Sequence, residues 1–411
     1  MLENWAGNLR YGAERVVTPG SVSAVQEVVA GAGRVKALGT RHSFSSIADT
    51  PGVLVSTSGL DAVEETDAAG LSVLVQAGVT YGRLCPILDR EGLALANLAS
   101  LPHISVGGAC ATATHGSGAL NGNLASSVIG MEMVLGDGRA EWISESSSRF
   151  LGSVVHVGAL GVVTRLRLRL EPAFSVRQRV FLDVPFESMR DLPAVMGSAY
   201  SVSFFTDWRT RGFTQVWLKR KDDSALPGWA SELTCATENV HPIPGASAEN
   251  CTAQCDVPGR WHERLPHFRM EFTPSSGEEL QSEYMVPLER GFEALMAVSA
   301  LGSEIAPILH VSEIRAVAAD EFWLSPNYRR ASLAIHFTWK KDWEAVRRVL
   351  PRIEAALAPF EPRAHWGKLS LLSPEAVRAG FPQWAAFRAL AAEMDPQGKF
   401  RNAFLDRLME G

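Results

Sequence analysis

Two glycine-rich segments carry residue types that suit a large phosphorylated cofactor. The first follows a short apolar run and reads Ala37-Leu38-Gly39-Thr40-Arg41-His42-Ser43. The second extends over 98–118 and is dominated by Gly, Ala, Ser and Thr. Glycines let backbone N–H groups approach oxyanions closely, and small neighbours leave room for a flat ring. A histidine beside such a ring can act as a ligand, form a covalent bond or move protons.

The common nucleotide motifs are absent from the sequence. The nearest approach to G-x-G-x-x-G is Gly116-x-Gly118-x-x-x-Gly122, which is one residue too long and has no acidic partner at the usual distance. Neither G-x-x-x-x-G-K-S/T nor G-x-S-x-G occurs. A Rossmann domain, a P-loop and a hydrolase nucleophile elbow are therefore excluded.

A second constellation lies in the later half of the chain. Residues two apart in a strand share a face, so Glu313 points the same way as Arg315, and His336 the same way as Thr338. An ion pair on an exposed sheet is the ordinary explanation. However, the alternate face of the later strand is apolar and consists of Leu333, Ile335, Phe337 and Trp339. The polar set therefore faces a cavity or solvent, and Lys368, in a Trp-Gly-Lys turn, adds a further donor.

The elements that position these residues change in character near residue 173. Before it, helix and strand patterns alternate: Ser23 and Gln26 predict a capping box, 35–38 a strand, and Asp137-Gly138 a hairpin. After it, longer strands are predicted at 201–209, 213–221, 309–317 and 332–340, with an amphipathic helix at 342–360. The pattern predicts an α+β cofactor domain and a second domain built on an antiparallel sheet.

Bulk properties are those of a globular enzyme. The chain has 411 residues, 46% hydrophobic and 20% charged, with a formal net charge of −6. We expect neither nucleic-acid binding nor a membrane span, and the first residues lack the features of a signal peptide, which favours the cytoplasm. The five scattered cysteines do not form a disulfide pattern, and Cys251-x-x-x-Cys255 lacks the second pair that zinc requires, so no metal is expected.

Taken together, the two glycine-rich segments resemble flavoproteins of the vanillyl-alcohol-oxidase family, in its sugar-alcohol and aldonolactone branch. The segments His365-Trp366-Gly367-Lys368 and Asp395-Pro396-Gln397-Gly398-Lys399-Phe400-Arg401-Asn402 resemble the same branch. The resemblance covers essentially the whole chain. It implies an FAD-binding domain over 1–172, completed by 369–411, and a substrate-binding cap domain over 173–368, with the flavin between them.

The resemblance also implies which residues hold the cofactor. His42 stands where this branch forms a covalent 8α-histidyl bond to FAD. By composition alone, the small residues of the second segment could equally form a cradle for the pyrophosphate or simply allow a strand and a loop to pack closely. The resemblance favours the cradle. The implied FAD-binding residues are Ala37, Leu38, Gly39, Thr40, Arg41, His42, Ser43, Ser100, Ser105, Gly107, Gly108, Ala109, Cys110, Ala111 and Val163.

The residues that match the branch's substrate site are Ser100, Glu313, Arg315, Thr338 and Lys368. The implied reaction is FAD-dependent oxidation of the terminal CH–OH of an acyclic polyol such as xylitol or sorbitol to the aldose, with O2 reduced to H2O2. Lys368, Arg315 and His336 are the expected catalytic groups, since donors at the substrate oxygen stabilise its alkoxide character. A monomer is expected.

Two other functions remain open from the sequence. An aldonolactone oxidase or dehydrogenase would use the same flavin with a ring-shaped substrate, such as a gulono- or galactono-1,4-lactone. A non-catalytic sugar-binding protein on the same fold is the other. Ala99 bears on oxygen, because the resemblance places this position near the flavin carbon that meets O2, and a small side chain there favours an oxidase.

Overall fold

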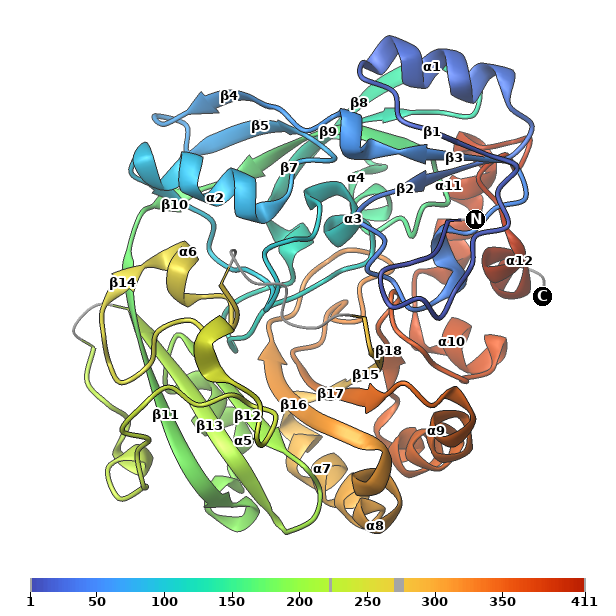
Figure 1. Ribbon diagram of the computed structural model, residues 1–411. Helices are drawn as coiled ribbons and strands as arrows, with labels where there is room; N and C mark the ends of the chain where they lie inside the picture. The colour runs from blue at the N-terminus through green and yellow to red at the C-terminus, as the bar shows by residue number, and fades with distance from the viewer. Residues whose placement is uncertain (1, 222–223, 270–276, 410–411) are drawn as a thin grey trace.

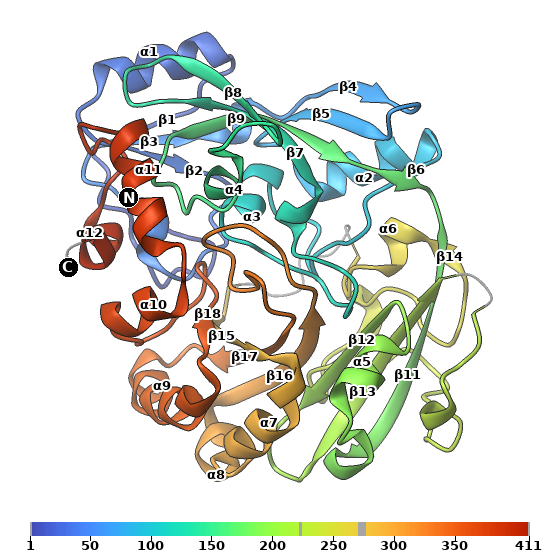
Figure 2. The same ribbon diagram turned by 180° about the vertical axis from the view of Figure 1, so that it is seen from behind.

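A computed structural model describes residues 2–221, 224–269 and 277–409. Two bodies of the molecule meet along the middle of Figure 1, one formed by the N-terminal part of the chain and one built on a large antiparallel sheet. The C-terminal helices lie beside the N-terminal body, and both chain ends are on that side (Figure 1). The view from behind in Figure 2 shows the same arrangement.

The N-terminal body contains two main sheets. A small parallel sheet has the order β1 (Arg15–Val17), β3 (Val53–Ser56), β2 (Val35–Leu38). An antiparallel sheet has the order β4 (Val63–Asp67), β5 (Ser72–Gln76), β9 (Val162–Arg169), β7 (Val128–Val134), β8 (Ala140–Ser144). A short pair, β6 (Leu93–Ala94) with β10 (Glu171–Pro172), follows. The predicted strand at 35–38 and the hairpin around Asp137-Gly138 are confirmed.

The helices of this body are α1 (Val22–Gly31), α2 (Tyr81–Arg90), α3 (Val106–Ala111) and α4 (Phe150–Ser153). The predicted capping box at Ser23 is wrong. The N-cap of α1 is Ser21, whose hydroxyl accepts a hydrogen bond from the Ala24 amide, while the Gln26 side chain donates to Gly138 O at 3.0 Å. Both serines suit an N-cap by type, and the tertiary contact of Gln26 decides which one is used.

The large sheet has the order β14 (Gly259–Arg260), β11 (Ser175–Pro185), β13 (Gly212–Lys221), β12 (Ser201–Thr206), β16 (Leu309–Val317), β17 (Ser332–Lys340), β15 (Glu279–Pro287), β18 (Arg363–Ala364). All its neighbouring strands pair antiparallel. The four longer strands predicted after residue 173 correspond to β12, β13, β16 and β17, and the hairpin predicted between the first two is confirmed.

Helices cover the apolar face of this sheet. They are α5 (Leu192–Gly197), α7 (Gly291–Ser299), α8 (Gly302–Ile305) and α9 (Trp343–Leu357), and they lie below the strands in Figure 1. Leu333, Ile335, Phe337 and Trp339 are fully buried in the same core cluster as the inward side chains of α7 and α9. The opposite face of the sheet is therefore free to point polar side chains toward the N-terminal body. A further short helix, α6 (Trp261–Arg264), lies in the connection between β13 and β15.

The chain ends with α10 (Pro374–Gly380), α11 (Trp384–Met394) and α12 (Ala403–Met409). Their buried side chains, including Phe387 and Leu405, share a core cluster with residues of the N-terminal sheet such as Val75 and Leu166. The Asp395–Asn402 segment is tied to the same body, because Lys399 O accepts from the Val35 amide at 2.9 Å and the Asn402 amide donates to Asp49 O at 2.7 Å.

Other features follow from the described ranges. The five cysteines are free thiols. Within 2–221, 224–269 and 277–409 no single helix is long and apolar enough to cross a membrane, although the bent pair Leu288–Ser299 and Gly302–Ile308 would suffice by length and composition. The same residues contain no group of three His, Cys, Asp or Glu side chains arranged to hold a metal ion.

Candidate active site

A cavity of about 300 Å³ lies between the two bodies. Its volume is within the usual range for small-molecule sites. The glycine-rich segments of the N-terminal body line one side, and β15, β16 and β17 of the large sheet line the other. All of the residues predicted from the sequence for cofactor and substrate line this cavity, with Cys110 as the exception.

The turn that carries His42 is held by its surroundings. Arg41 has φ 64°, a left-handed conformation that is costly for a residue other than glycine. The Trp5 amide donates to Arg41 O at 2.9 Å, and the Trp5 indole stacks on the His42 ring with centroids 5.3 Å apart. Burial, followed by nearby positive charge, lowers the pKa of His42 to about 4. The imidazole is therefore neutral near pH 7, and its buried Nδ1 has no hydrogen-bond partner.

The second glycine-rich segment approaches this turn closely. A Cβ on Gly39 would lie 2.6 Å from Ser105 Oγ, and one on Gly107 would lie 2.8 Å from Ala77 Cβ. Ser105 precedes α3, and its buried hydroxyl has no partner. A close backbone approach, an unpaired buried hydroxyl and small side chains are features that a phosphate group and a flat ring would fill. The residues present therefore fit FAD.

Cys110 differs from the sequence expectation. Its thiol points into the core, where it lies 3.9 Å from the Tyr81 hydroxyl and 3.9 Å from Leu124 O, and it does not line the cavity. Because α3 turns its side chains through 100° per residue, Ala109 and Ala111 reach the cavity while Cys110 packs behind it. The thiol serves as a small buried side chain.

The large sheet presents its polar side chains to the cavity in rows across the strands. Glu313 on β16 stands opposite His336 on β17, which stands opposite Glu283 on β15. In the next row Thr338 stands opposite Gln281. Directly opposed residues of antiparallel strands point to the same face, so the register alone places these side chains together. The predicted cluster of Glu313, Arg315, His336 and Thr338 is present.

Glu283 is the centre of a buried polar network. Its carboxylate accepts a hydrogen bond from Arg315 at 2.9 Å and lies 3.1 Å from His115 Nε2 and 3.5 Å from His336 Nδ1. Burial alone would raise the pKa of Glu283, but His115, His336 and Arg315 outweigh it and hold that pKa well below its usual value. The site therefore contains a permanent carboxylate and a permanent guanidinium side by side.

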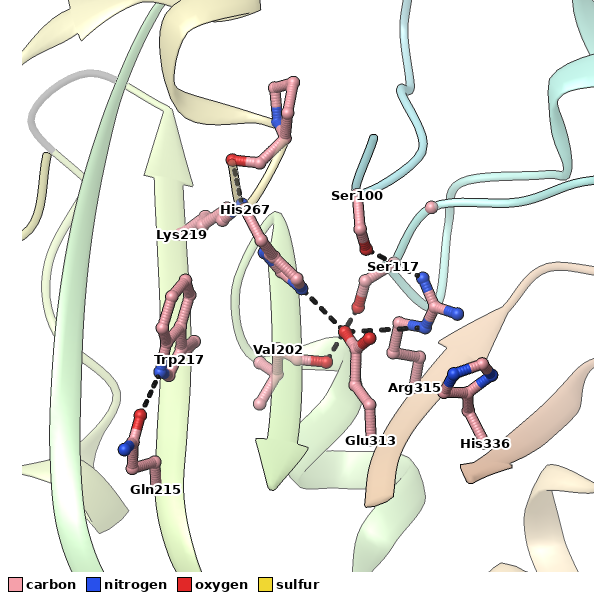
Figure 3. A network of polar contacts seen from close by, with 12 residues as sticks. Ser100, Ser117, Val202, Gln215, Trp217, Lys219, His267, Glu313, Arg315 and His336 are labelled. Carbon is pink, nitrogen blue, oxygen red and sulfur yellow. Dashed lines mark hydrogen bonds and ion pairs between the residues drawn. The ribbon is translucent and has the colours of Figure 1, made fainter. Parts of the chain in front are cut away.

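Glu313 is the second carboxylate of the site. Its Oε1 is 2.6 Å from His267 Nε2 and 3.5 Å from Arg315 Nε, as Figure 3 shows. Arg315 also donates to the Ser100 hydroxyl at 3.3 Å, which links the sheet to the second glycine-rich segment. Burial alone would raise the pKa of Glu313, but Arg315 and His267 outweigh burial and hold that pKa below its usual value. Glu313 is therefore ionised.

Lys368 reaches the site from a turn that packs on the His42 loop. The Phe44 amide donates to Gly367 O at 2.6 Å, and the Ser45 hydroxyl donates to Trp366 O at 2.8 Å. The Lys368 ammonium donates to the Gln281 side chain. Burial lowers the pKa of Lys368, and Arg315 lowers it further, which makes its proton easier to lose. The structure thus brings together His42 and Lys368, which are 326 residues apart in sequence.

Several site residues have no sequence signal of their own. Glu283 and Gln281 come from β15, whose pattern was not recognised as a strand, and only its register with β17 places them at the cavity. His267 lies in the irregular segment after α6, and His365 also lines the cavity, with its ring centroid 6.0 Å from that of His115. Alternation in 279–287 is the one sequence feature that would have indicated Glu283 and Gln281.

Family models match both parts of the chain. Residues 13–144 match the model described as an FAD binding domain. Residues 275–408 match the model described as D-arabinono-1,4-lactone oxidase. The first match contains both glycine-rich segments, and the second contains β15, β16, β17 and Lys368.

Full-length relatives give a sharper assignment. An alditol oxidase from a Streptomyces strain is 50% identical, covering 99% of each chain. An L-gulono-1,4-lactone dehydrogenase from Mycobacterium tuberculosis is 29% identical, covering 99% of this chain and 98% of the relative. The crystal structure of cholesterol oxidase from B. sterolicum has a TM-score of 0.78 at 15% identity over 99% of this chain and 96% of that one, which confirms the expected two-domain α+β fold. The chain therefore belongs to the alditol oxidase family, within the vanillyl-alcohol-oxidase type of FAD-dependent flavoenzymes.

Proposed function

We propose that this protein oxidises the terminal CH–OH of an acyclic polyol, such as xylitol or sorbitol, to the aldose and reduces O2 to H2O2. The observation that carries the proposal is the buried polar wall of β15, β16 and β17, which faces the same cavity as the His42 loop. The 50% identity to an alditol oxidase over the full chain supports the same substrate class.

FAD is the redox group of this reaction, and it accepts a hydride from the substrate carbon. We assign its attachment to a covalent bond between His42 and the 8α position of the flavin. The neutral imidazole and its unpaired Nδ1 suit a nucleophile. The pyrophosphate and ring are assigned to 37–43 and to Ser105, Gly108, Ala109, Ala111 and Val163, together with Ser100. Cys110 is left out, because its thiol points into the core.

Three basic side chains that line the cavity act on the reacting hydroxyl. Lys368 and Arg315 are positive donors that stabilise negative charge at the substrate oxygen. Burial, followed by the charge of Lys368, lowers the pKa of His336, so its imidazole is neutral and can accept the hydroxyl proton. Glu283 contacts both Arg315 and His336 and so fixes their orientation.

The remaining polar residues position the rest of the polyol. Glu313 lies in the same row of the sheet as His336 and Thr338 in the next row, and Ser100 approaches from the other side through its contact with Arg315. Each offers a hydrogen-bonding group to a hydroxyl of an open-chain sugar alcohol. Orientation of the reacting C–H bond by such groups lowers the entropic cost of the reaction.

The proposal also includes the domain bounds, the location in the cell, the oligomeric state and a second candidate substrate. We assign 1–172 with 369–411 to the FAD-binding domain and 173–368 to the cap domain. We place the enzyme in the cytoplasm as a monomer. A lactone substrate is the second candidate, supported by the family match over 275–408, but the lactone enzymes that align over nearly the whole chain are only 25–29% identical.

A peroxide assay over C3 to C6 polyols, beside gulono- and galactono-1,4-lactone, tests the substrate. We expect H2O2 with xylitol and sorbitol at a kcat/KM at least 10-fold above that of either lactone, which corresponds to about 1.4 kcal/mol. Higher activity on a lactone would replace the polyol assignment. A purified protein without yellow colour would refute the flavoenzyme itself.

A further inference from the structure

Lys219 is a buried lysine beside the substrate-facing wall, on the same face of the sheet. It lies on β13 and is only 1% exposed. Its ammonium donates to Leu265 O, to Pro266 O at 3.3 Å and to His267 Nδ1 at 3.2 Å. An ammonium has three N–H donors, and each has an acceptor here. Burial lowers the pKa of Lys219 to about 7, although Glu313 opposes this shift, and the three acceptors favour the charged form.

The contacts with Lys219 and Glu313 together determine which nitrogen of His267 carries the proton. Burial lowers the pKa of His267 to about 4, so the ring is neutral and has one N–H. Nδ1 accepts from the lysine, and the N–H is therefore at Nε2, 2.6 Å from Glu313 Oε1. Lys219 donates to His267 and His267 donates to Glu313, and Figure 3 shows the three side chains in this order.

The register of the sheet explains why this arrangement reaches the site. Lys219 pairs with Ser201 on β12, and Glu313 pairs with Phe205 on the same strand, so both side chains point to the cavity face. The segment after α6 lays His267 over β12 between them. Both contacts of Glu313 reach Oε1, from His267 and from Arg315 at 3.5 Å.

We propose that Lys219 and His267 are positioning residues for the polyol. Lys219 fixes the tautomer of His267, His267 holds Glu313 Oε1, and Glu313 Oε2 accepts a substrate hydroxyl. This inference rests on the proposed function, because it assigns Glu313 to polyol binding. It adds two residues that act through Glu313 and determine how this carboxylate presents its charge.

A purely structural role for Lys219 makes a different prediction. Lys219 would then only satisfy the carbonyls of Leu265 and Pro266, and its loss would lower thermal stability without changing affinity. The two roles separate in a double-mutant cycle with Glu313, since residues that act through one another are not additive.

The test measures the Kd of xylitol on enzyme whose flavin has been reduced anaerobically, because the reduced enzyme does not oxidise the polyol. We expect Lys219→Met and Glu313→Gln each to raise Kd about 10-fold or more. The double variant should lie within 2-fold of Glu313→Gln. The KM for xylitol in turnover should rise more than kcat falls. Lys221→Met is the matched control, because Lys221 lies on the same strand and binds Glu171 at 2.8 Å instead.

A second pair of variants covers the case in which Lys219→Met does not fold. His267→Gln keeps an N–H donor for Glu313 and should retain most of the affinity, whereas His267→Phe removes the donor and should match Glu313→Gln. Flavin content and Tm report folding separately.

The outcomes are distinct. The positioning role is overturned if the Kd of Lys219→Met or His267→Phe stays within 2-fold of wild type. It is also overturned if the Kd of the double variant rises by the product of the two single increases. Both outcomes leave the proposed function intact. Absence of xylitol binding by the wild-type enzyme overturns the proposed function and this inference with it.

Discussion

At the scale of single residues, His42 has the clearest assigned role. Its ring is neutral, stacked on Trp5 and unpaired at Nδ1. We expect His42→Ala to leave the flavin dissociable, because the noncovalent contacts of the cradle remain but the bond is lost. Precipitation with acid, followed by the absorbance of the supernatant, measures the released flavin. His310, on β16, does not line the cavity, so His310→Ala should keep all flavin in the pellet. Retention of flavin by His42→Ala would place the bond at another residue.

Lys368 is the second residue whose role can be isolated. We expect Lys368→Met to lower kcat/KM on the order of 10² or more, because it removes a positive donor from the developing oxyanion while keeping the length of the side chain. Steady-state peroxide formation measures the loss. Lys340→Met is a suitable control, since that ammonium binds Pro307 O at an exposed end of β17. A decrease of only a few-fold would remove Lys368 from the reaction.

Glu283 illustrates what residue types alone did not reveal. The sequence identified Glu313 and Arg315 by their spacing, yet the carboxylate that contacts most of the basic groups comes from a strand that was not predicted. A single glutamate has no distinguishing pattern in the sequence. Only the pairing of β15 with β17 gives it partners.

At the scale of elements, close packing explains why the cradle contains glycine where a larger residue would not fit. A Cβ on Gly107 would lie 2.8 Å from Ala77 Cβ and 2.9 Å from Ala77 O. We expect Gly107→Ala to push α3 away from the segment after β5, with a destabilisation of about 1–3 kcal/mol and a lower flavin content. Thermal unfolding and the ratio of flavin to protein absorbance test this. Gly31→Ala, where nothing lies within 4 Å of the new Cβ, should be neutral, and an unchanged flavin ratio in Gly107→Ala would contradict the cradle.

Strands and turns with a strong local pattern were predictable from the sequence. Features that depend on tertiary contacts were not. The strand patterns of 309–317 and 332–340 identified β16 and β17, and the Asp137-Gly138 turn identified the hairpin of β7 and β8. The start of α1 was misplaced by two residues, because Ser21 and Ser23 are equivalent by type. The direction of Cys110 was also outside local reasoning, since it depends on how α3 sits against the core.

At the scale of the whole molecule, the buried histidines couple stability to pH. Burial is the main cause that lowers the pKa of His156 to about 3 and of His267 to about 4. In the unfolded chain both histidines bind protons below about pH 6.5. Unfolding therefore takes up protons between about pH 6.5 and 4, and the free energy of unfolding falls as the pH falls through that range.

This coupling gives a measurable slope. We expect urea unfolding of the holoenzyme to show a lower free energy at pH 5.0 than at pH 7.0. His267→Gln should show a smaller difference between the two pH values, because one of the titrating groups is gone. Equal free energies at both pH values would mean that these rings are protonated in the folded protein.

The sequence by itself determined the family, the cofactor class and most of the residues assigned to the site. Glycine spacing, a histidine in a turn and alternation in two strands depend on local geometry, so they can be recognised along the chain. The tertiary structure decided which groups surround them. It placed Lys368 against the His42 loop, Glu283 against Arg315 and Lys219 against His267. These contacts join segments far apart in sequence, and their energetics depend on burial and strand register, which exist only once the chain has folded.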